Sequence, residues 1–347
     1  MDVTASSFIS ACYGRNEGRL PIWIMRQAGR YLPEYRAVRE RATFQELCRS
    51  PQLIAEVVRQ PVERFGFDAA ILFSDILTVL EPMGADVSFP SGGPQIKNPI
   101  KSPDDVNRLK DVDVEETLPF VLEGIRRIKQ VMPQVPLIGF AGSPFTLACY
   151  LIEGKGSKNF DAPKRFLHEH PRAAEQLLEL LADVIGRYLQ AQVAAGAEAV
   201  QIFESWGGIL SRDDFTDWSA RLVNRIFTRL KSARVPRLFF VNNVSPYLDA
   251  LKDIDCEVIG VDYRVDMNQV ARALSGKSVQ GNLDPAVLFG TPEHVVERAT
   301  RILDSMDNLD SVIFNLGHGI QPKTPLESVQ ALVETVHNYR RQSCRTT

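Results

Sequence analysis

Cysteine is scarce in this chain of 347 residues, and its five cysteines lie far apart in the sequence. No Cys-x-x-Cys pair and no Cys/His cluster occurs, so neither a disulfide framework nor a structural zinc site is indicated. We therefore expect free thiols in a reducing compartment, which predicts a cytoplasmic protein. The cysteines are Cys12, Cys48, Cys149, Cys256 and Cys344.

Long apolar runs are missing as well. No stretch approaches the ~18 apolar residues of a membrane helix, and the start of the chain lacks the pattern of a secretory signal. With 40 basic and 43 acidic residues, the formal net charge is −3, which predicts neither a nucleic acid nor a membrane as partner. Glycine-rich phosphate motifs of the Rossmann or Walker type are absent, and we interpret Gly154-Lys155-Gly156-Ser157 as a surface loop.

The chain does contain a regular alternation of short apolar runs and helical patterns. The runs are nearly continuous, as expected for parallel strands covered on both faces. The candidate strands are Ile22–Met25, Ala69–Phe73, Leu137–Phe140, Ala199–Phe203, Leu238–Val241, Val258–Val261, Ser278–Gly281 and Val312–Asn315. Eight strands with intervening helices predict the α/β class, as a (β/α)8 TIM-like barrel in a single domain over residues 1–347. An open doubly wound sheet is the alternative.

Three helices carry clear sequence signals. A helix beginning at Pro51 contains Pro61, where we expect a kink or a break. A long helix is predicted from Pro171 to about Ala195, ended by Gly196. The last helix is expected to open with a capping box at Thr324–Glu327.

Polar residues gather directly after the candidate strands, where barrel enzymes collect their chemistry. A concentration of this kind at one face predicts a ligand site. The residues are Arg26, Gln27, Arg30, Ser74, Asp75, Gly142, Ser143, Glu204, Ser205, Asn242, Asn243, Asp262, Asn282, Asp284 and His318.

Two arginines lie four residues apart in the segment RQAGR, and guanidinium groups bind carboxylates through two parallel hydrogen bonds. Gly29 between them would let the backbone approach a ligand closely. The alternative for Arg26 and Arg30 is a set of ordinary ion pairs, for example with Glu34. The aromatic residues around them favour a binding site, since such a segment is costly to expose.

Asp75 is the acidic residue that directly follows an apolar strand, and it could either cap the helix expected near Ile76 or act on a ligand. His318 lies between two glycines and after the last strand, which favours a functional role over a structural one. Ser205 has no Gly-x-Ser-x-Gly context and no nearby histidine, so hydrogen bonding is favoured over nucleophilic catalysis.

Six segments, in order along the whole chain, resemble the uroporphyrinogen decarboxylase family. The most specific are PIWIMRQAGRYLPEYR at residues 21–36 and GFAGSPFTLACYLIEGKGS at 139–157. Shorter ones are FSDIL at 73–77, IFESWGG at 202–208, VQGNLDP at 279–285 and FNLGHGI at 314–320. Trp206 in the fourth segment varies among members of the family and is given no role.

The resemblance implies a (β/α)8 barrel, a homodimer, and no metal or organic cofactor. It also implies an enzyme of haem biosynthesis, a carboxy-lyase that converts the four acetate arms of uroporphyrinogen III to methyl groups, giving coproporphyrinogen III and carbon dioxide. Asp75 and Arg26 would be catalytic. The substrate-binding residues would be Arg26, Gln27, Ala28, Gly29, Arg30, Phe44, Asp75, Tyr150, Ser205 and His318.

The residues fit this chemistry. Loss of carbon dioxide from an acetate leaves a carbanion, which normally requires a cofactor as electron sink. A protonated pyrrole ring of the substrate can serve instead, so the protein needs one anion, Asp75, and several cations for the other carboxylates. Two alternatives stay open. One is a methyltransferase of the same superfamily, whose zinc-binding His-x-Cys this chain lacks, and the other is an inactive barrel that only binds tetrapyrrole.

Overall fold

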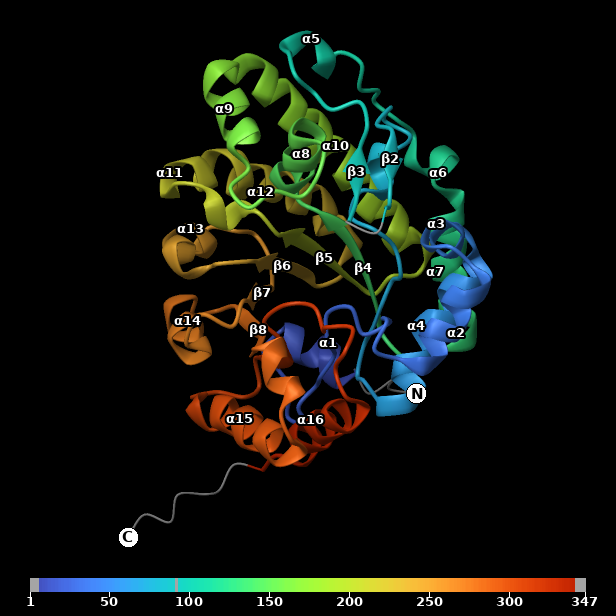
Figure 1. Ribbon diagram of the computed structural model, residues 1–347. Helices are drawn as coiled ribbons and strands as arrows, with labels where there is room; N and C mark the ends of the chain where they lie inside the picture. The colour runs from blue at the N-terminus through green and yellow to red at the C-terminus, as the bar shows by residue number, and fades with distance from the viewer. Residues whose placement is uncertain (1–5, 91–92, 341–347) are drawn as a thin grey trace.

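A parallel seven-stranded sheet curls into a barrel at the centre of the protein (Figure 1). The computed structural model describes residues 6–90 and 93–340. Neighbouring strands follow the order β1-β4-β5-β6-β7-β8-β9, and all these pairs are parallel. The α/β barrel is thus confirmed over the open doubly wound sheet. The strands are β1 (Ala70–Ile71), β4 (Leu137–Gly142), β5 (Ala199–Glu204), β6 (Arg237–Val241), β7 (Val258–Val261), β8 (Ser278–Leu283) and β9 (Val312–Leu316).

The expected first strand is wrong as a strand, although its residues do occupy that place in the barrel. Ile22 forms a single parallel bridge to Phe314 of β9. On its other side, its carbonyl accepts a hydrogen bond from the Asp68 amide at 2.9 Å, just before β1. The run stops there because the Gln27 amide turns back to the Ile24 carbonyl and Arg26 takes a left-handed φ of 65°. One bridging residue therefore closes the barrel between β9 and β1.

A buried carboxylate fixes this closure. The Asp68 side chain is 4% exposed and accepts the Ile22 amide at 2.8 Å. It also pairs with Arg19 and lies 2.9 Å from Nε2 of His337 near the end of the last helix. Asp68 thus ties the closing segment to residues near both ends of the described chain.

Helices ring the strands (Figure 1), because each parallel connection must cross back over an apolar face. Those before or between the barrel strands are α4 (Pro51–Phe65), α7 (Pro119–Val131), α10 (Pro171–Ala195), α12 (Arg221–Leu230), α13 (Leu248–Lys252), α14 (Met267–Ala273), α15 (Pro292–Ser305) and, after β9, α16 (Leu326–Asn338). The shorter or peripheral elements are α1 (Ser7–Cys12), α2 (Pro33–Arg41), α3 (Phe44–Arg49), α5 (Pro103–Val106), α6 (Val114–Thr117), α8 (Pro144–Glu153), α9 (Asp161–Glu169), α11 (Arg212–Phe215) and the hairpin β2 (Val87–Ser88) with β3 (Gln95–Ile96).

The helix predictions have mixed outcomes. Helix α10 has the predicted bounds, and Gly196 follows it with a φ of 122°. Helix α4 runs through Pro61 without a break, so of the two predicted outcomes, a kink or a break, the break is wrong. The capping box at the last helix is also wrong. Pro325 keeps an extended ψ of 141°, α16 begins only at Leu326, and the buried Thr324 hydroxyl has no hydrogen-bond partner among the described residues.

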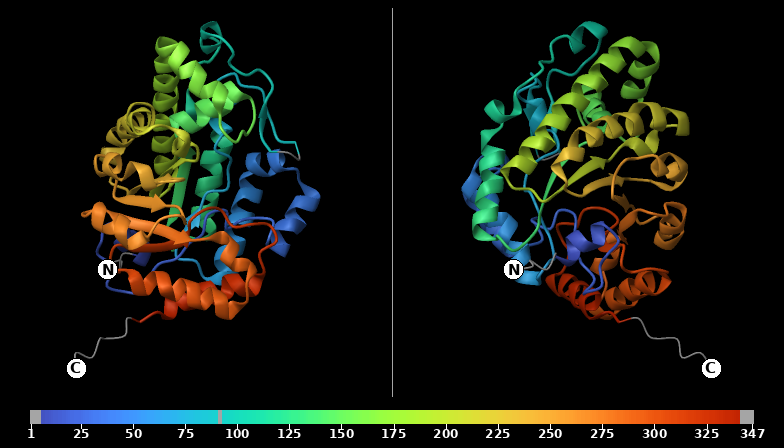
Figure 2. Two further views of the ribbon diagram at one scale, coloured as in Figure 1. Left: turned by 60° about the vertical axis from the view of Figure 1, so that its left-hand side comes forward. Right: turned by 180° about the vertical axis from the view of Figure 1, so that it is seen from behind.

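Helix α1 covers the amino-terminal end of the barrel. The Ser278 hydroxyl at the start of β8 donates to the Ala11 carbonyl at 2.7 Å. Figure 2 shows this N-terminal segment and the last helices together at one end of the molecule.

Cys12, Cys48, Cys149 and Cys256 are free and buried, as expected, and Cys344 lies outside the described residues. No helix within residues 6–90 and 93–340 has the length and apolar character to cross a membrane.

The closure predicts a stability effect. Asp68→Ala leaves the buried Ile22 amide without its acceptor and removes the partner of Arg19 and His337, so we expect a loss of about 2–3 kcal/mol in the free energy of unfolding. Urea denaturation measures it. Asp86→Ala, at an exposed carboxylate 3.7 Å from Lys97, is the control and should change little. Equal losses in both variants would contradict the role given to Asp68.

Candidate active site

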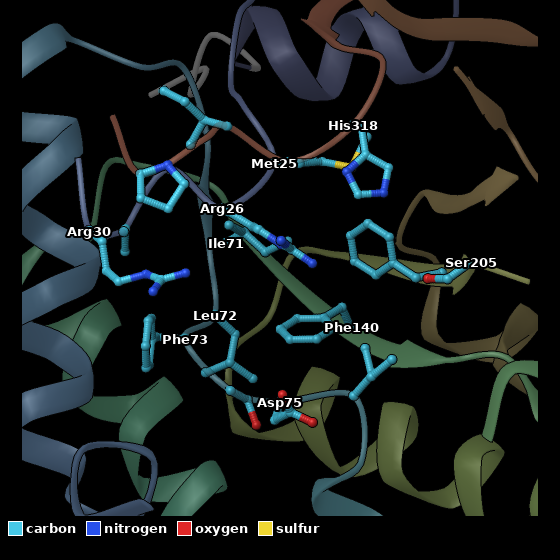
Figure 3. Close-up of a pocket in the computed structure, with 18 of the residues that line it drawn as sticks. Met25, Arg26, Arg30, Ile71, Leu72, Phe73, Asp75, Phe140, Ser205 and His318 are labelled. Atoms are coloured by element: carbon cyan, nitrogen blue, oxygen red, sulfur yellow. The ribbon is translucent and has the colours of Figure 1, made fainter. Parts of the chain in front are cut away.

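An open cavity of about 420 Å³ lies at the carboxyl ends of the barrel strands, within the range usual for ligand pockets of roughly 300–1,000 Å³. In Figure 3, Arg26 and Arg30 enter it from one side, Asp75 from below, and Ser205 and His318 from the opposite side. The structure thus brings together predicted residues that lie at six separate places along the chain. The predicted binding residues that line the cavity are Arg26, Ala28, Gly29, Arg30, Phe44, Asp75, Tyr150, Ser205 and His318.

Gln27 is the predicted binding residue that does not line the cavity. Its side chain is 1% exposed and turned inward, where the amide nitrogen donates to the Ala69 carbonyl at 3.1 Å. The amide oxygen accepts from the Ile24 amide at 3.2 Å. Gln27 therefore braces the turn that carries its neighbours, and sequence position alone could not separate bracing from binding.

The two arginines of the signature segment keep their charges available. In the described part of the chain neither Arg26 nor Arg30 takes part in an ion pair, and Glu34 instead binds Arg64, with Nε and Oε1 2.8 Å apart. The expected alternative, ion pairing with Glu34, is therefore wrong. Arg36 donates to the Arg30 carbonyl at 2.8 Å, which fixes the backbone of the segment and leaves the Arg30 guanidinium to face the cavity.

Two glycines lie close against Arg26, one against its backbone and one against its side chain. A β-carbon at Gly29 would lie 2.8 Å from the Arg26 carbonyl oxygen, so the close neighbour of Gly29 is this backbone. Gly29 also lines the cavity, so the close approach to a ligand stays a prediction beside this close approach within the segment. A β-carbon at Gly319 would lie 2.5 Å from Cδ and 2.9 Å from Nε of Arg26. The Arg26 side chain therefore lies against the backbone of the loop that carries His318.

Asp75 caps a turn and also lines the cavity, so its position is compatible with both roles that the sequence allowed. One carboxylate oxygen accepts the Leu77 amide at 2.8 Å, which caps the turn after β1, and the side chain also lines the cavity. The element that follows is a short 3-10 helix at Thr78–Leu80 in place of the α-helix expected near Ile76. Burial raises the pKa of Asp75 to about 6, although the Leu77 amide and the Arg26 charge both act to lower it.

The remaining predicted polar residues are neutral hydrogen-bonding groups. Burial raises the pKa of Tyr150. Burial, with the nearby Arg26 charge, lowers the pKa of His318, which favours its uncharged imidazole. The Ser205 amide donates to the Thr146 hydroxyl at 2.9 Å, which holds the turn after β5 and presents Ser205 to the cavity.

Sequence reasoning missed the aromatic wall of the cavity. Phe140, Phe203 and Phe240 follow one another on adjacent strands, with ring centroids 5.6 and 5.9 Å apart in edge-to-face contacts. Phe73 and Tyr35 extend the wall, with centroids 5.7 Å apart. The sequence did contain a signal for this wall, because each of three successive candidate strands has a phenylalanine near its end.

Ser74, after β1, also lines the cavity, whereas several other polar residues after the strands serve the loops. Ser143 caps α8, and Glu204 is fully buried. The Asp262 carboxylate accepts the Val244 amide at 3.2 Å and pairs with Arg264. Within residues 6–90 and 93–340, no three histidine, cysteine, aspartate or glutamate side chains gather as a metal site would require. The cavity thus offers two unpaired cations, one carboxylate and neutral donors beside an aromatic wall, a set suited to an apolar ring system with several carboxylates.

Comparison with known proteins agrees with this set. The family model described as Uroporphyrinogen decarboxylase (URO-D) matches residues 4–339. The chain belongs to the uroporphyrinogen decarboxylase family. It is 45% identical to the uroporphyrinogen decarboxylase of Pelobacter propionicus over 336 residues, covering 96% of this chain and 98% of the relative. The uroporphyrinogen decarboxylase of Chloroflexus aggregans is 46% identical over 339 residues, covering 96% and 95%.

Solved structures share the fold at lower identity. A methyltransferase from Methanosarcina mazei superposes with a TM-score of 0.81 over 95% of this chain and 97% of the other, at 21% identity. A B12-independent methionine synthase from Shewanella sp. W3-18-1 gives a TM-score of 0.57 at 14% identity, over 92% and 96%. At these identities the likeness shows the barrel alone, and activity must be argued from the residues in the cavity.

The packing of Arg26 predicts the result of a one-atom insertion. Gly319→Ala places a β-carbon in the space of the Arg26 side chain, so we expect that side chain to adopt a different rotamer in a crystal structure of the variant. Gly156→Ala, where no atom lies within 4 Å of the new carbon, is the control. An unmoved Arg26 in Gly319→Ala would show that the loop does not hold it.

Proposed function

We propose that the protein decarboxylates uroporphyrinogen III, converting its four acetate arms to methyl groups and giving coproporphyrinogen III and carbon dioxide. The observation that carries the proposal is the facing of unpaired Arg26 and Arg30 with Asp75 across one partly apolar cavity. A tetrapyrrole with carboxylate arms presents apolar rings, N–H groups and anions, which match the aromatic wall, the carboxylate and the arginines in turn. Membership of the family supports the same substrate.

The reaction needs an electron sink. A proton adds to the α-carbon of the pyrrole, next to the carbon that bears the acetate arm, and makes the ring cationic. The bond to the carboxylate then breaks, its electrons neutralise the ring, and carbon dioxide leaves. Protonation of the resulting methylene carbon and loss of the first proton restore the aromatic pyrrole. Each arm consumes one proton overall, so the chain's residues must stabilise a transient cation and supply no electrons.

The cavity residues divide this work by charge. Asp75 stabilises the cationic ring and accepts hydrogen bonds from pyrrole N–H groups. Arg26 and Arg30 bind carboxylate arms as forked donors. Arg26 also assists proton delivery, a role made difficult because a guanidinium holds its proton tightly. Tyr150, Ser205 and the neutral His318 donate to further carboxylate oxygens, and Phe44 packs on the ring system near the mouth.

Anaerobic incubation with enzymatically made uroporphyrinogen III tests the proposal, with products separated by their number of carboxyl groups. We expect conversion to the four-carboxyl product with no added cofactor and no loss after exhaustive chelation. Loss of activity on chelation, restored by one metal, would overturn the cofactor-free mechanism. Absence of any decarboxylated product would overturn the function and leave a barrel that only binds tetrapyrrole.

We also propose, on family resemblance, that the whole chain is one catalytic domain that forms a homodimer in the cytoplasm, with the strand-end face at the interface. The parallel sheet, which continues without interruption from β1 to β9, supports the single domain. Light scattering on active enzyme tests the dimer, and a monomer at micromolar concentration would contradict it.

Replacement of Asp75 separates the proposed catalytic role from turn capping. Asp75→Asn keeps an acceptor for the Leu77 amide but removes the charge, so we expect kcat/KM to fall by ~10² or more. Asp75→Glu keeps a displaced charge and should retain more activity. Because burial raises the pKa of Asp75, its ionised form costs stability at neutral pH, and the melting temperature of Asp75→Asn should equal or exceed that of the wild type at pH 8. Full activity in Asp75→Asn would refute the mechanism.

The pH dependence follows from the same carboxyl. The mechanism requires Asp75 in its ionised form, and the pKa of Asp75 is about 6 in the free protein. We therefore expect kcat/KM to be level above pH 7 and to fall below pH 6. His318, whose pKa is lowered from its usual value, could titrate in the same range, and His318→Gln is the control. The fall in kcat/KM below pH 6 should persist in His318→Gln. Its disappearance in that variant would assign the fall to His318.

A further inference from the structure

The arginines that line the cavity lie on one of its sides. In Figure 3, Arg26 and Arg30 reach the cavity from the side opposite to Ser205 and His318. The proposed substrate carries carboxylates around its whole ring, because four acetate arms react and four further carboxyl groups remain in the product. Carboxylates at the side of Ser205 and His318 therefore lack a cationic partner unless one lies at the rim of the cavity.

Arg264 lies at this rim, on the loop after β7 and next to the loop that carries His318. A β-carbon at Gly317 would lie 2.8 Å from Cβ of Tyr263, so the two loops are in direct contact. Burial is the main cause of the lowered pKa of His318, and the charges of Arg26 and Arg264 lower it further. Arg264 thus lies beside the part of the cavity that has no arginine.

Three partners hold the Arg264 guanidinium in place. Its Nη1 donates to Asp262 Oδ2 at 2.6 Å and to Asn242 Oδ1 at 3.2 Å. Its Nη2 donates to the Tyr263 hydroxyl at 3.0 Å, and the guanidinium carbon lies 4.5 Å from the centroid of that ring. Asn242 in turn donates to the Ser205 carbonyl at 3.4 Å. Two hydrogen bonds therefore connect the guanidinium to a residue that lines the cavity.

The Arg264 guanidinium keeps two N–H groups for a ligand. A guanidinium has five N–H donors, and three of them are used by the partners above. The Nε–H and the second N–H of Nη2 have no acceptor within residues 6–90 and 93–340. The Arg264 side chain is 47% exposed, whereas that of Asp262 is fully buried. The ion pair therefore anchors the guanidinium from the protein side and leaves part of it open to solvent.

The backbone that carries Arg264 is fixed as well. Nδ2 of the buried Asn282 donates to the Asp262 carbonyl at 3.0 Å and to the Val265 carbonyl at 2.8 Å, on either side of Arg264. A guanidinium whose backbone and inner N–H groups are held in this way loses little conformational entropy when it binds an anion.

We propose that Arg264 binds a carboxylate arm of the substrate at the rim of the cavity, opposite Arg26 and Arg30. The carboxylate accepts charge-assisted hydrogen bonds from the free N–H groups, while Asp262 keeps the guanidinium in place. Because Arg264 lies at the rim, its effect is on binding and not on the chemical step. This inference deepens the proposed function and rests on it for the identity of the ligand.

The main test measures the Kd of uroporphyrinogen III by rapid anaerobic ultrafiltration, with every variant made in the Asp75→Asn background to keep turnover low. Arg264→Gln removes the charge, so we expect Kd to rise roughly 3- to 10-fold, as for a charged hydrogen bond that is partly exposed. Arg301→Gln is the matched control. It removes the same charge from an exposed arginine of α15 that pairs with Glu297 at 2.7 Å, and Kd should not change.

A second variant separates binding from stability. Asp262→Asn keeps an acceptor for the Val244 amide but removes the anionic partner of Arg264, so the melting temperature should fall. The Arg264 charge is then less compensated, so Kd should equal that of the background protein or be lower. Parallel rises in Kd in Arg264→Gln and Asp262→Asn would show a merely structural ion pair and overturn the proposal.

Turnover gives a further readout with Asp75 intact. Arg264→Gln should raise KM by a similar factor and leave kcat within about twofold of the wild type, as expected for uniform binding. An unchanged Kd, or a loss confined to kcat, would overturn the role of Arg264. If the wild type converts no uroporphyrinogen, the proposed function fails, while the ultrafiltration still decides whether Arg264 binds the carboxylate arms.

Discussion

The position of Ile22 between β9 and β1 is the constraint on which the rest of the structure depends. One bridge to Phe314 and one hydrogen bond from the Asp68 amide replace an eighth strand. Because the closing segment is short, the residues after it form a turn. This turn carries Arg26 and Arg30 across the carboxyl end of the barrel. A longer strand would close the sheet with more hydrogen bonds and would point these side chains along the barrel wall. At this point the barrel lacks the backbone hydrogen bonds of an eighth strand, and Arg26 and Arg30 reach the cavity instead.

A buried carboxylate, Glu204, and a half-buried one, Asp75, illustrate how the same residue chemistry serves structure and function. Glu204 receives three hydroxyls and two amides, so its burial is compensated and its neighbours are fixed. Asp75 receives the Leu77 amide on one oxygen and turns toward a cavity with uncompensated positive charge. Burial raises the pKa of both carboxyls, but only at Asp75 can a cationic ligand supply the missing compensation.

Much of this arrangement could be predicted from the sequence, because apolar runs report parallel strands directly. Seven of the candidate strands are confirmed in place, and the residues after them supply most of the polar lining. The eighth fails because periodicity does not reveal a left-handed residue such as Arg26. The inward turn of Gln27 also escapes the sequence, since it depends on a partner far along the chain, the Ala69 carbonyl.

The composition of the cavity has a consequence for how the chain acquires activity. Its polar lining comes from segments near both ends and the middle of the chain, and Arg26 meets Gly319 only after the ends have joined. Contacts between such distant residues carry a large loop-closure entropy and belong to the slow steps of folding. A half-built barrel can hold most of its helices and strands without any binding site. Recovery of turnover during refolding therefore reports on the joining of the two ends of the sheet, which secondary-structure spectra detect poorly.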